Sequence, residues 1–150
     1  MTATTQHAAI EALVAMWSAA VDVPVYDGPN AIENAPKGAV WVGYDPTAED
    51  GEAVSTSQDW AELGAQNRSK DETGTITCAA AAWSGDSNTQ PRRVAVAQLL
   101  TDLETAHRAD VTLGGAVMYS NFAAGNLHQQ LTADGNEVLA LFTVTFRSRI

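Results

Sequence analysis

The chain has 150 residues, of which 45% are hydrophobic and 17% charged, a composition typical of a folded domain and not of a disordered segment. Its formal net charge of −10 argues against tight binding to nucleic acid, because proteins that hold phosphates need clustered lysine and arginine. The single cysteine excludes an internal disulfide, and the sequence has neither a signal-peptide pattern nor an apolar run of membrane-spanning length, so we expect the protein to start in a cytoplasm.

The first part of the chain predicts one helix followed by short strands. Apolar residues recur at helical spacing over residues 5–20. The pattern stops before Pro24, which disfavours helix at the residue that precedes it. Residues 23–29 then predict a short extended segment that ends in an Asp-Gly-Pro turn, and residues 39–44 predict a strand.

An acidic stretch follows this strand. Residues 45–56 lack periodicity and predict a loop that is long enough to do more than connect two elements. Residues 55–63 alternate weakly and predict a further strand, with Trp60 or Leu63 turned inward. Between residues 45 and 62 the chain has no lysine or arginine, and its carboxylates there are Asp45, Glu49, Asp50, Glu52, Asp59 and Glu62. The lysines and arginines lie elsewhere in the chain, and a surface divided in this way can pair with copies of itself or with a complementary partner.

Residues 72–86 predict a strand that contains four consecutive alanines, 79–82. Alanine is a poor strand former and a good helix former, so its presence needs a reason. Small side chains let other layers approach the sheet closely, and Cys78 is nearly as small. We expect helices on one face of this strand and a neighbouring element against the other, although a tight helix–sheet interface within one chain would need the same alanines.

Residues 92–110 predict the second helix. Asn88 or Thr89 is the expected N-cap, and a proline suits the first turn. Arg92 and Arg93 lie at the helix N-terminus, where the helix dipole favours acidic side chains. Two solvated arginines cost little there, but a partner outside the helix would also account for them.

The last part of the chain predicts a long β-hairpin. The Asp-Gly pair at 134–135 is a strong hairpin signal between two β-like runs. In the returning strand, Phe142, Val144 and Phe146 share one face. Helices separated by antiparallel strands predict a single α+β domain over residues 1–150, with a mostly antiparallel sheet and two helices packed on one of its faces.

The sequence predicts no catalytic or cofactor-binding site. Cys78 could be paired with His107 or His128 as nucleophile and base, but a lone cysteine in an apolar strand is usually a buried filler. The acidic stretch fails the twelve-residue calcium-loop pattern, and the motifs of phosphate-binding loops, serine hydrolases and zinc sites are absent. We therefore predict a protein that is not an enzyme and that has no catalytic, cofactor-binding or metal-binding residues.

Four segments of the sequence carry a resemblance to a known family: 25–29 (VYDGP), 40–46 (VWVGYDP), 81–86 (AAWSGD) and 138–150 (VLALFTVTFRSRI). They resemble the tail terminator proteins of long-tailed phages, especially those that infect actinobacteria, and the resemblance spans nearly the whole chain. It implies a virion structural protein with a tail-terminator-like α+β fold that assembles in the host cytoplasm into a six-membered ring. Such a ring caps the tail tube, stops its polymerisation and joins it to the head-proximal neck.

The resemblance also implies partners and roles for the charged segments. The partners are further copies of the chain, the tail tube protein and a neck or head-completion protein, and DNA passes without specific binding. The candidate subunit-interface residues are Arg92, Arg93, Arg147 and Arg149. The candidate acidic residues, which would line the pore or face the tube, are Asp45, Glu49, Asp50 and Glu52. The alternatives are a small soluble ligand-binding or hydrolytic α+β domain with its site under the 45–56 loop, or another tail tube or neck protein of related fold.

Overall fold

The computed structural model describes residues 2–30, 37–48, 53–60, 69–132 and 135–150. The elements in these residues are α1 (Gln6–Ala20), β1 (Val25–Asp27), β2 (Gly38–Val42), β3 (Val54–Trp60), β4 (Lys70–Ser84), α2 (Thr89–Ala109), β5 (Tyr119–Thr132) and β6 (Gly135–Arg149). The strands form one sheet in the order β1-β2-β4-β6-β5, and β3 pairs with β4 next to β2. β1 runs parallel to β2, and the other described pairs are antiparallel. The predicted α+β class is confirmed.

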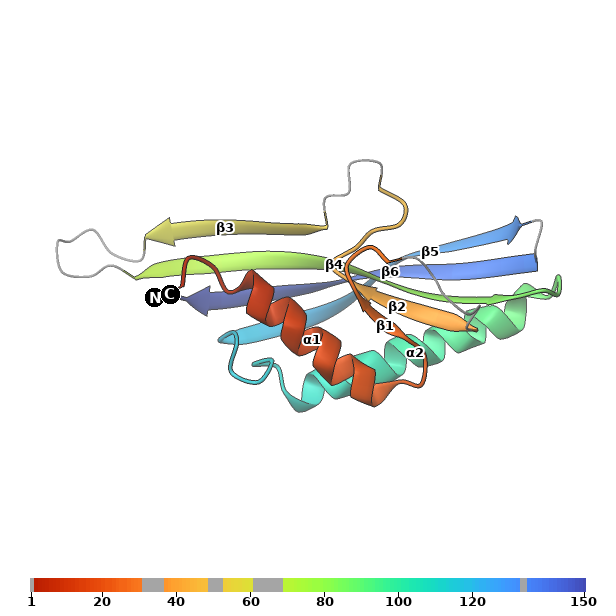
Figure 1. The fold of residues 1–150 in the computed structure, drawn as a ribbon, viewed down its shortest axis with the longest axis horizontal. Helices are drawn as coiled ribbons and strands as arrows, with labels where there is room; N and C mark the ends of the chain where they lie inside the picture. Colours follow the sequence, from red (N-terminus) through yellow and green to blue (C-terminus); the bar gives the residue numbers. More distant parts are fainter. Residues whose placement is uncertain (1, 31–36, 49–52, 61–68, 133–134) are drawn as a thin grey trace.

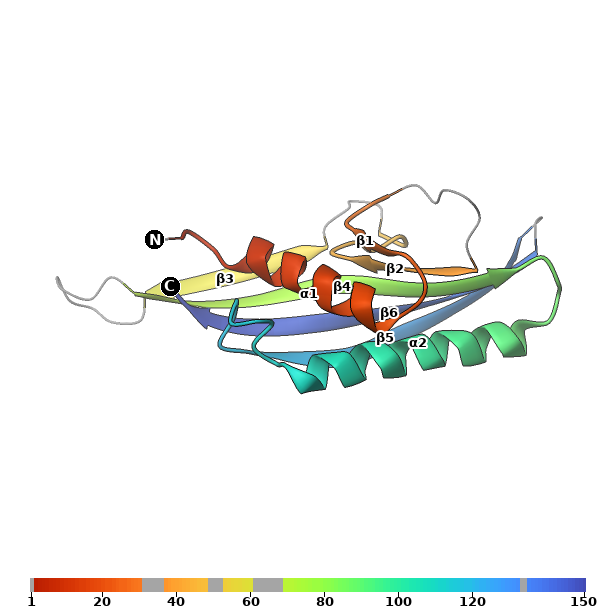
Figure 2. The same cartoon turned by 60° about the horizontal axis from the view of Figure 1, so that its bottom comes forward.

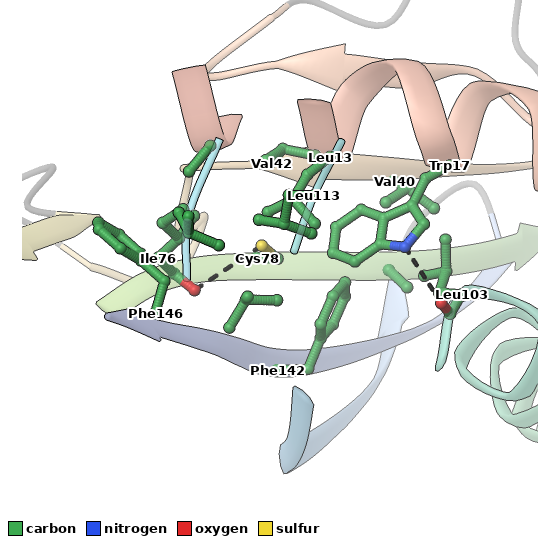
Figure 3. Close-up of a cluster of buried hydrophobic side chains, with 14 of the residues drawn as sticks. Leu13, Trp17, Val40, Val42, Ile76, Cys78, Leu103, Leu113, Phe142 and Phe146 are labelled. Atoms are coloured by element: carbon green, nitrogen blue, oxygen red, sulfur yellow. Dashed lines mark hydrogen bonds between the residues drawn. The ribbon is translucent and has the colours of Figure 1, made fainter. Parts of the chain in front are cut away.

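Both helices cover the same face of the sheet (Figures 1 and 2). In α1, Ala9, Leu13 and Trp17 recur every four residues and are fully buried. The Trp17 ring packs edge-on against Phe142 of β6, with 5.5 Å between ring centroids. Its indole N–H donates to the carbonyl of Leu103 in α2 at 3.1 Å, so this one side chain joins both helices to the sheet (Figure 3).

The predicted alternation in the returning strand is confirmed. Phe142, Val144 and Phe146 of β6 are buried on the face that the helices cover. The Phe146 ring lies directly over Gly74 of the neighbouring β4, where a Cβ atom would collide with it. A glycine inside a strand usually weakens it, but here it makes the space that the aromatic ring fills.

The alanines of β4 are buried on both faces of the sheet by side chains of this chain. Ala80 and Ala82 lie on the face that the helices cover. Ala79 and Ala81 lie on the opposite face, called here the helix-free face, in a buried cluster with Trp41 and Leu139. Bulky side chains from the two flanking strands thus cover the small ones between them. The alanines therefore need no neighbouring subunit to explain them.

The expectation that Trp60 turns inward is wrong, because its side chain is 65% exposed. Trp60 ends β3, an edge strand, and the ammonium group of Lys70 lies 5.7 Å from the centre of its ring. Leu63, the other candidate, lies outside the described residues.

A buried carboxylate fixes the start of α1. Glu72 of β4 is fully buried, and its Oε1 accepts the backbone N–H of Thr5 at 2.7 Å and the Thr5 hydroxyl at 2.6 Å. The amide of Gln58 on β3 donates to the other carboxylate oxygen. The Ser148 hydroxyl of β6 lies 3.0 Å from that of Thr5. One network therefore ties α1 to three strands at this end of the sheet.

Candidate functional site

The four segments 25–29, 40–46, 81–86 and 138–150 come together in the fold. They correspond to β1, to β2 and the residues after it, to the end of β4, and to β6 with the last residue. These strands are consecutive neighbours in the sheet, although up to about 50 residues separate them in the sequence. The resemblance thus concerns one continuous part of the sheet.

The acidic loop interrupts what would otherwise be one continuous strand. β2 and β3 pair with β4 in line, and the eleven residues 43–53 stand opposite the single residue Thr77. Gly43 has a positive φ of 71°, which turns the chain out of the sheet. The N–H of Tyr44 donates to the Thr77 carbonyl, and the Thr77 N–H donates to the carbonyl of Ala53. Both ends of the loop are therefore attached at one point of β4.

The described start of this loop lies on the helix-free face. Tyr44 packs with the buried cluster on that face. The Asp45 carboxylate accepts the Thr47 N–H at 2.8 Å and the Thr47 hydroxyl at 2.6 Å, which makes a local turn. Asp45 is half-buried, and the other candidate acidic residues, Glu49, Asp50 and Glu52, lie outside the described residues.

Beyond the loop, the helix-free face carries hydroxyl groups instead of apolar side chains. Threonines on β4 and β6 face one another across this pair of strands, and serines on β3 continue the row. These side chains are partly or fully exposed: Ser55, Ser57, Thr73, Thr75, Thr77, Thr143 and Thr145. This half of the face is polar and carries most of its charge at one end, where Arg147, Arg149 and Asp71 meet.

Two of the candidate interface arginines are paired inside the chain. Arg149 donates to Asp71 at 2.8 Å, and the guanidinium of Arg147 lies 3.6 Å from the same carboxylate. The hydrogen bond from Arg149 lowers the pKa of Asp71, and the charges of both arginines lower it further. A contact with Tyr119 of β5 raises the pKa of Arg147. These two arginines therefore have partners without a second subunit.

The other two candidate arginines begin α2 and point in different directions. Arg93 donates to the side-chain oxygen of Gln129 on β5 at 2.8 Å. Arg147 contacts β5 ten residues away, roughly 30 Å along the strand, so the four arginines do not form one cluster. Asn88 is the N-cap residue, as predicted, but its side chain makes no capping hydrogen bond.

Arg92 lines a cavity of about 490 Å³ together with Lys37, Trp83 and Ser84. The side chains of Lys37 and Arg92 have no hydrogen-bond or ion-pair partner among the described residues. Together with the Ser84 hydroxyl, these two cationic groups suit an anionic group such as a carboxylate. The sequence singled out Arg92 but missed Lys37, since the two are brought together only when β2 pairs with β4.

The residues that could have made a catalytic pair lie apart. Cys78 is buried on the face that the helices cover, and burial raises the pKa of its thiol to about 12, so it is not a reactive thiolate. His128 pairs with Leu139 and lies on the helix-free face, where it lines a cavity of about 170 Å³ with Pro46 and Thr47. Ligand pockets usually exceed about 300 Å³, so this cavity gives the ligand-binding alternative little support.

His107 is buried and makes a hydrogen bond to Ser120, but the pair is not a catalytic one. The Ser120 hydroxyl donates to the carbonyl of Val111 at 2.8 Å, so it accepts the Nε2–H of His107 at 2.7 Å. Nδ1 has no partner among the described residues. In this arrangement the serine is not activated by the histidine, and both side chains are shielded from solvent. Within the described residues, no group of histidine, cysteine and carboxylate side chains could hold a metal ion.

Acidification is expected to destabilise the protein through His107. Burial lowers its pKa, an effect that Arg108 reinforces and Glu104 and Asp110 oppose. Because the pKa in the folded state is below the unfolded value of about 6.5, the unfolded state takes up the proton first and stability falls as the pH drops below that value. His107→Gln keeps a donor for Ser120 and does not titrate. Urea unfolding at pH 7.5 and 5.5 should show a smaller loss for the variant than for the wild type, and equal losses would contradict the assignment.

No protein-family model matches the chain, and the search of curated proteins finds no match. None of the helices in the described residues has the length and apolar character needed to cross a membrane.

Proposed function

We propose that this chain is a tail terminator of a long-tailed phage, a virion structural protein and not an enzyme. Copies of it form a ring of six subunits in the host cytoplasm. The ring caps the tail tube, stops its polymerisation and joins it to the neck protein at the head-proximal end of the tail. The observation that carries the proposal is that the four resembling segments occupy consecutive strands of one sheet in an α+β fold.

The charge distribution supports a ring through which DNA passes. The net charge is −10, and the acidic loop leaves the sheet on the helix-free face, beside a row of uncharged hydroxyl groups. If this face lines the channel, carboxylates repel the DNA phosphates and threonines offer no cationic group to hold them. DNA then moves through the ring without binding.

The basic cavity beside α2 supports docking between subunits. Lys37 and Arg92 lack carboxylate partners among the described residues of a chain that is strongly acidic overall. An acidic side chain of the next copy or of the neck protein would neutralise them. Such pairs mainly guide association and fix the orientation of partners.

Purified protein is expected to form particles of several subunits, alone or when mixed with tail tube protein, and to stop tube growth. Light scattering after size-exclusion chromatography measures the mass, and electron microscopy with tube protein shows the cap. A strict monomer that leaves tube growth unchanged would contradict the proposal. Open-ended filaments of the chain alone would indicate a tube protein instead.

Reversing charge in the basic cavity is expected to block assembly without unfolding the subunit. Arg92→Glu removes the proposed contact, and Arg108→Glu is the matched control. Arg108 is an exposed arginine on the same helix that pairs only locally with Glu104. Circular dichroism should show that both variants are folded, and light scattering should show ring formation lost in Arg92→Glu alone. Normal assembly of Arg92→Glu would remove this cavity from the interface.

A further inference from the structure

Two long strands leave one edge unpaired within the described residues. β5 is the last strand of the sheet, after β6, and β3 pairs on one side with β4. β1 also ends the sheet, but it has three residues. β5 has 14 residues and β3 has seven, and the two strands lie at opposite edges of the sheet (Figure 2). Each offers a row of backbone N–H and C=O groups that is unpaired within the described residues.

The two strands carry few of the features that usually prevent edge pairing. Soluble proteins protect exposed edges with lysines and other charges, prolines or very short strands. β5 contains no charged residue and no proline, although a bulge lies between Ala124 and Leu127. β3 contains one charged side chain, Asp59. Strands of this length with so little protection are suited to pairing with another strand.

Exposed apolar side chains gather at the same two edges. Seven large hydrophobic side chains are exposed in the described part of the chain, and five of them lie on β3, on β5 or directly before β5: Trp60, Met118, Tyr119, Leu127 and Leu131. The exposed fraction reaches 65% for Trp60 and 73% for Leu131. Clustered exposure of this kind marks an interaction surface, whereas scattered single residues do not.

We infer that the free edge of β5 pairs with the free edge of β3 in a second copy of this chain. The strands β3, β4, β6 and β5 alternate in direction, so a second copy in the same orientation continues the sheet with an antiparallel β5–β3 pair. The two edges differ, and each copy therefore keeps one edge free for the next. A head-to-tail contact of this type closes into a ring when its rotation returns to the start.

Charge at the two edges favours a second copy as the occupant. Two arginines contact β5, Arg93 through Gln129 and Arg147 through Tyr119. β3 has one charged residue, the exposed Asp59, and Lys70 of β4 contacts this strand through Gln58 and Trp60. Arg147 and Lys70 thus have contacts within the chain, whereas Arg93 at β5 and Asp59 on β3 have no ion-pair partner among the described residues, and their opposite signs favour β5 against β3 over either edge against itself. This inference deepens the proposed function, on which it rests, by naming the contact between subunits.

The test blocks one edge at a time with lysine. Variant A carries Leu127→Lys and Leu131→Lys on β5, and variant B carries Ser55→Lys and Ser57→Lys on β3. All four side chains are exposed, and circular dichroism with thermal melting checks that both variants stay folded. Ala15→Lys is the control, since it places lysine at an exposed apolar residue of α1, outside both edge strands. Light scattering measures the mass of each variant at concentrations that assemble the wild type.

A and B are each expected to remain at the mass of one chain, the control to assemble like the wild type, and an equimolar mixture of A and B to stop at two chains. Assembly of either variant alone, or a mixture that stays monomeric, would overturn the inference. Self-association of B but not A would indicate β5 against β5 and would also overturn it.

The test also separates the edge contact from the proposed function. If A and B still form rings that cap tubes, the proposed function stands and the edge contact fails. If the edges behave as expected but wild-type rings do not stop tube growth, the proposed function fails instead. A wild type that stays monomeric alone and with tube protein overturns both.

Discussion

Replacing Trp17 with alanine is expected to lower the free energy of unfolding by about 3–5 kcal/mol. The side chain is fully buried between α1, α2 and β6, and its removal leaves a cavity next to Phe142. It also leaves the Leu103 carbonyl without the indole donor that joins the helices. Urea unfolding followed by circular dichroism measures the change without relying on tryptophan fluorescence.

The matched control for this prediction is Trp60→Ala, the same substitution on an exposed edge strand. Trp60 contributes a cation–π contact with Lys70 but little burial, so we expect a loss of less than about 1 kcal/mol. Trp17→Phe retains most of the packing and loses the hydrogen bond to Leu103, so its effect should lie between the two. Equal effects of the two alanine variants would show that α1 does not depend on this side chain.

Replacing Glu72 with glutamine is expected to destabilise the fold by about 1–3 kcal/mol. The two side chains have nearly the same shape, but the carboxylate accepts hydrogen bonds at both oxygens, from Thr5 and Gln58. A glutamine would place an NH₂ group against one set of these donors, and an unsatisfied buried polar group costs about 1–3 kcal/mol. Asp71→Asn is the matched control, because this neighbouring carboxylate forms ion pairs at the surface and should matter far less.

The effect of Glu72 should depend on pH in a defined direction. Burial raises the pKa of Glu72, but the hydrogen bonds from Thr5, Thr4 and Gln58 together lower it by more, so the net pKa is below its usual value. The stabilisation is therefore complete above the unfolded pKa of about 4.3 and is lost as the pH falls through the lower, folded value. Urea midpoints from pH 6 to pH 3 should fall more steeply for the wild type than for Glu72→Gln. Parallel curves would contradict this role.

Periodicity predicted most of the fold because helix and strand patterns are local. The stripe of α1, the alternation of β6 and the hairpin of β5 and β6 follow from neighbours a few residues apart, and the structure confirms them. Trp60, one of two candidates for an inward position, is exposed, and the sequence did not show this because an edge strand alternates like a half-buried one. The inward role of Glu72 was not visible either, since its partner Thr5 is distant in sequence, as is Ser148, which Thr5 contacts.

The candidate surfaces were predicted less well, because they depend on which strands become neighbours. Arg147 and Arg149 were expected to seek a partner subunit, yet Asp71 is brought beside them by the pairing of β4 with β6. The sequence did not single out Lys37, because it lines one cavity with Arg92 only in the folded chain. Composition suggests a strand at β5, but that the strand is the last in its sheet is a property of the topology alone.

The attachment of the acidic loop at Thr77 separates the length of that loop from the register of the sheet. Since Tyr44 and Ala53 both meet one residue of β4, the backbone ladders of β2 and β3 are set independently of what lies between them. An epitope tag inserted in this segment is therefore expected to leave the described strand pairs in place. The same frame can thus present different loops to different partners while keeping its core sequence.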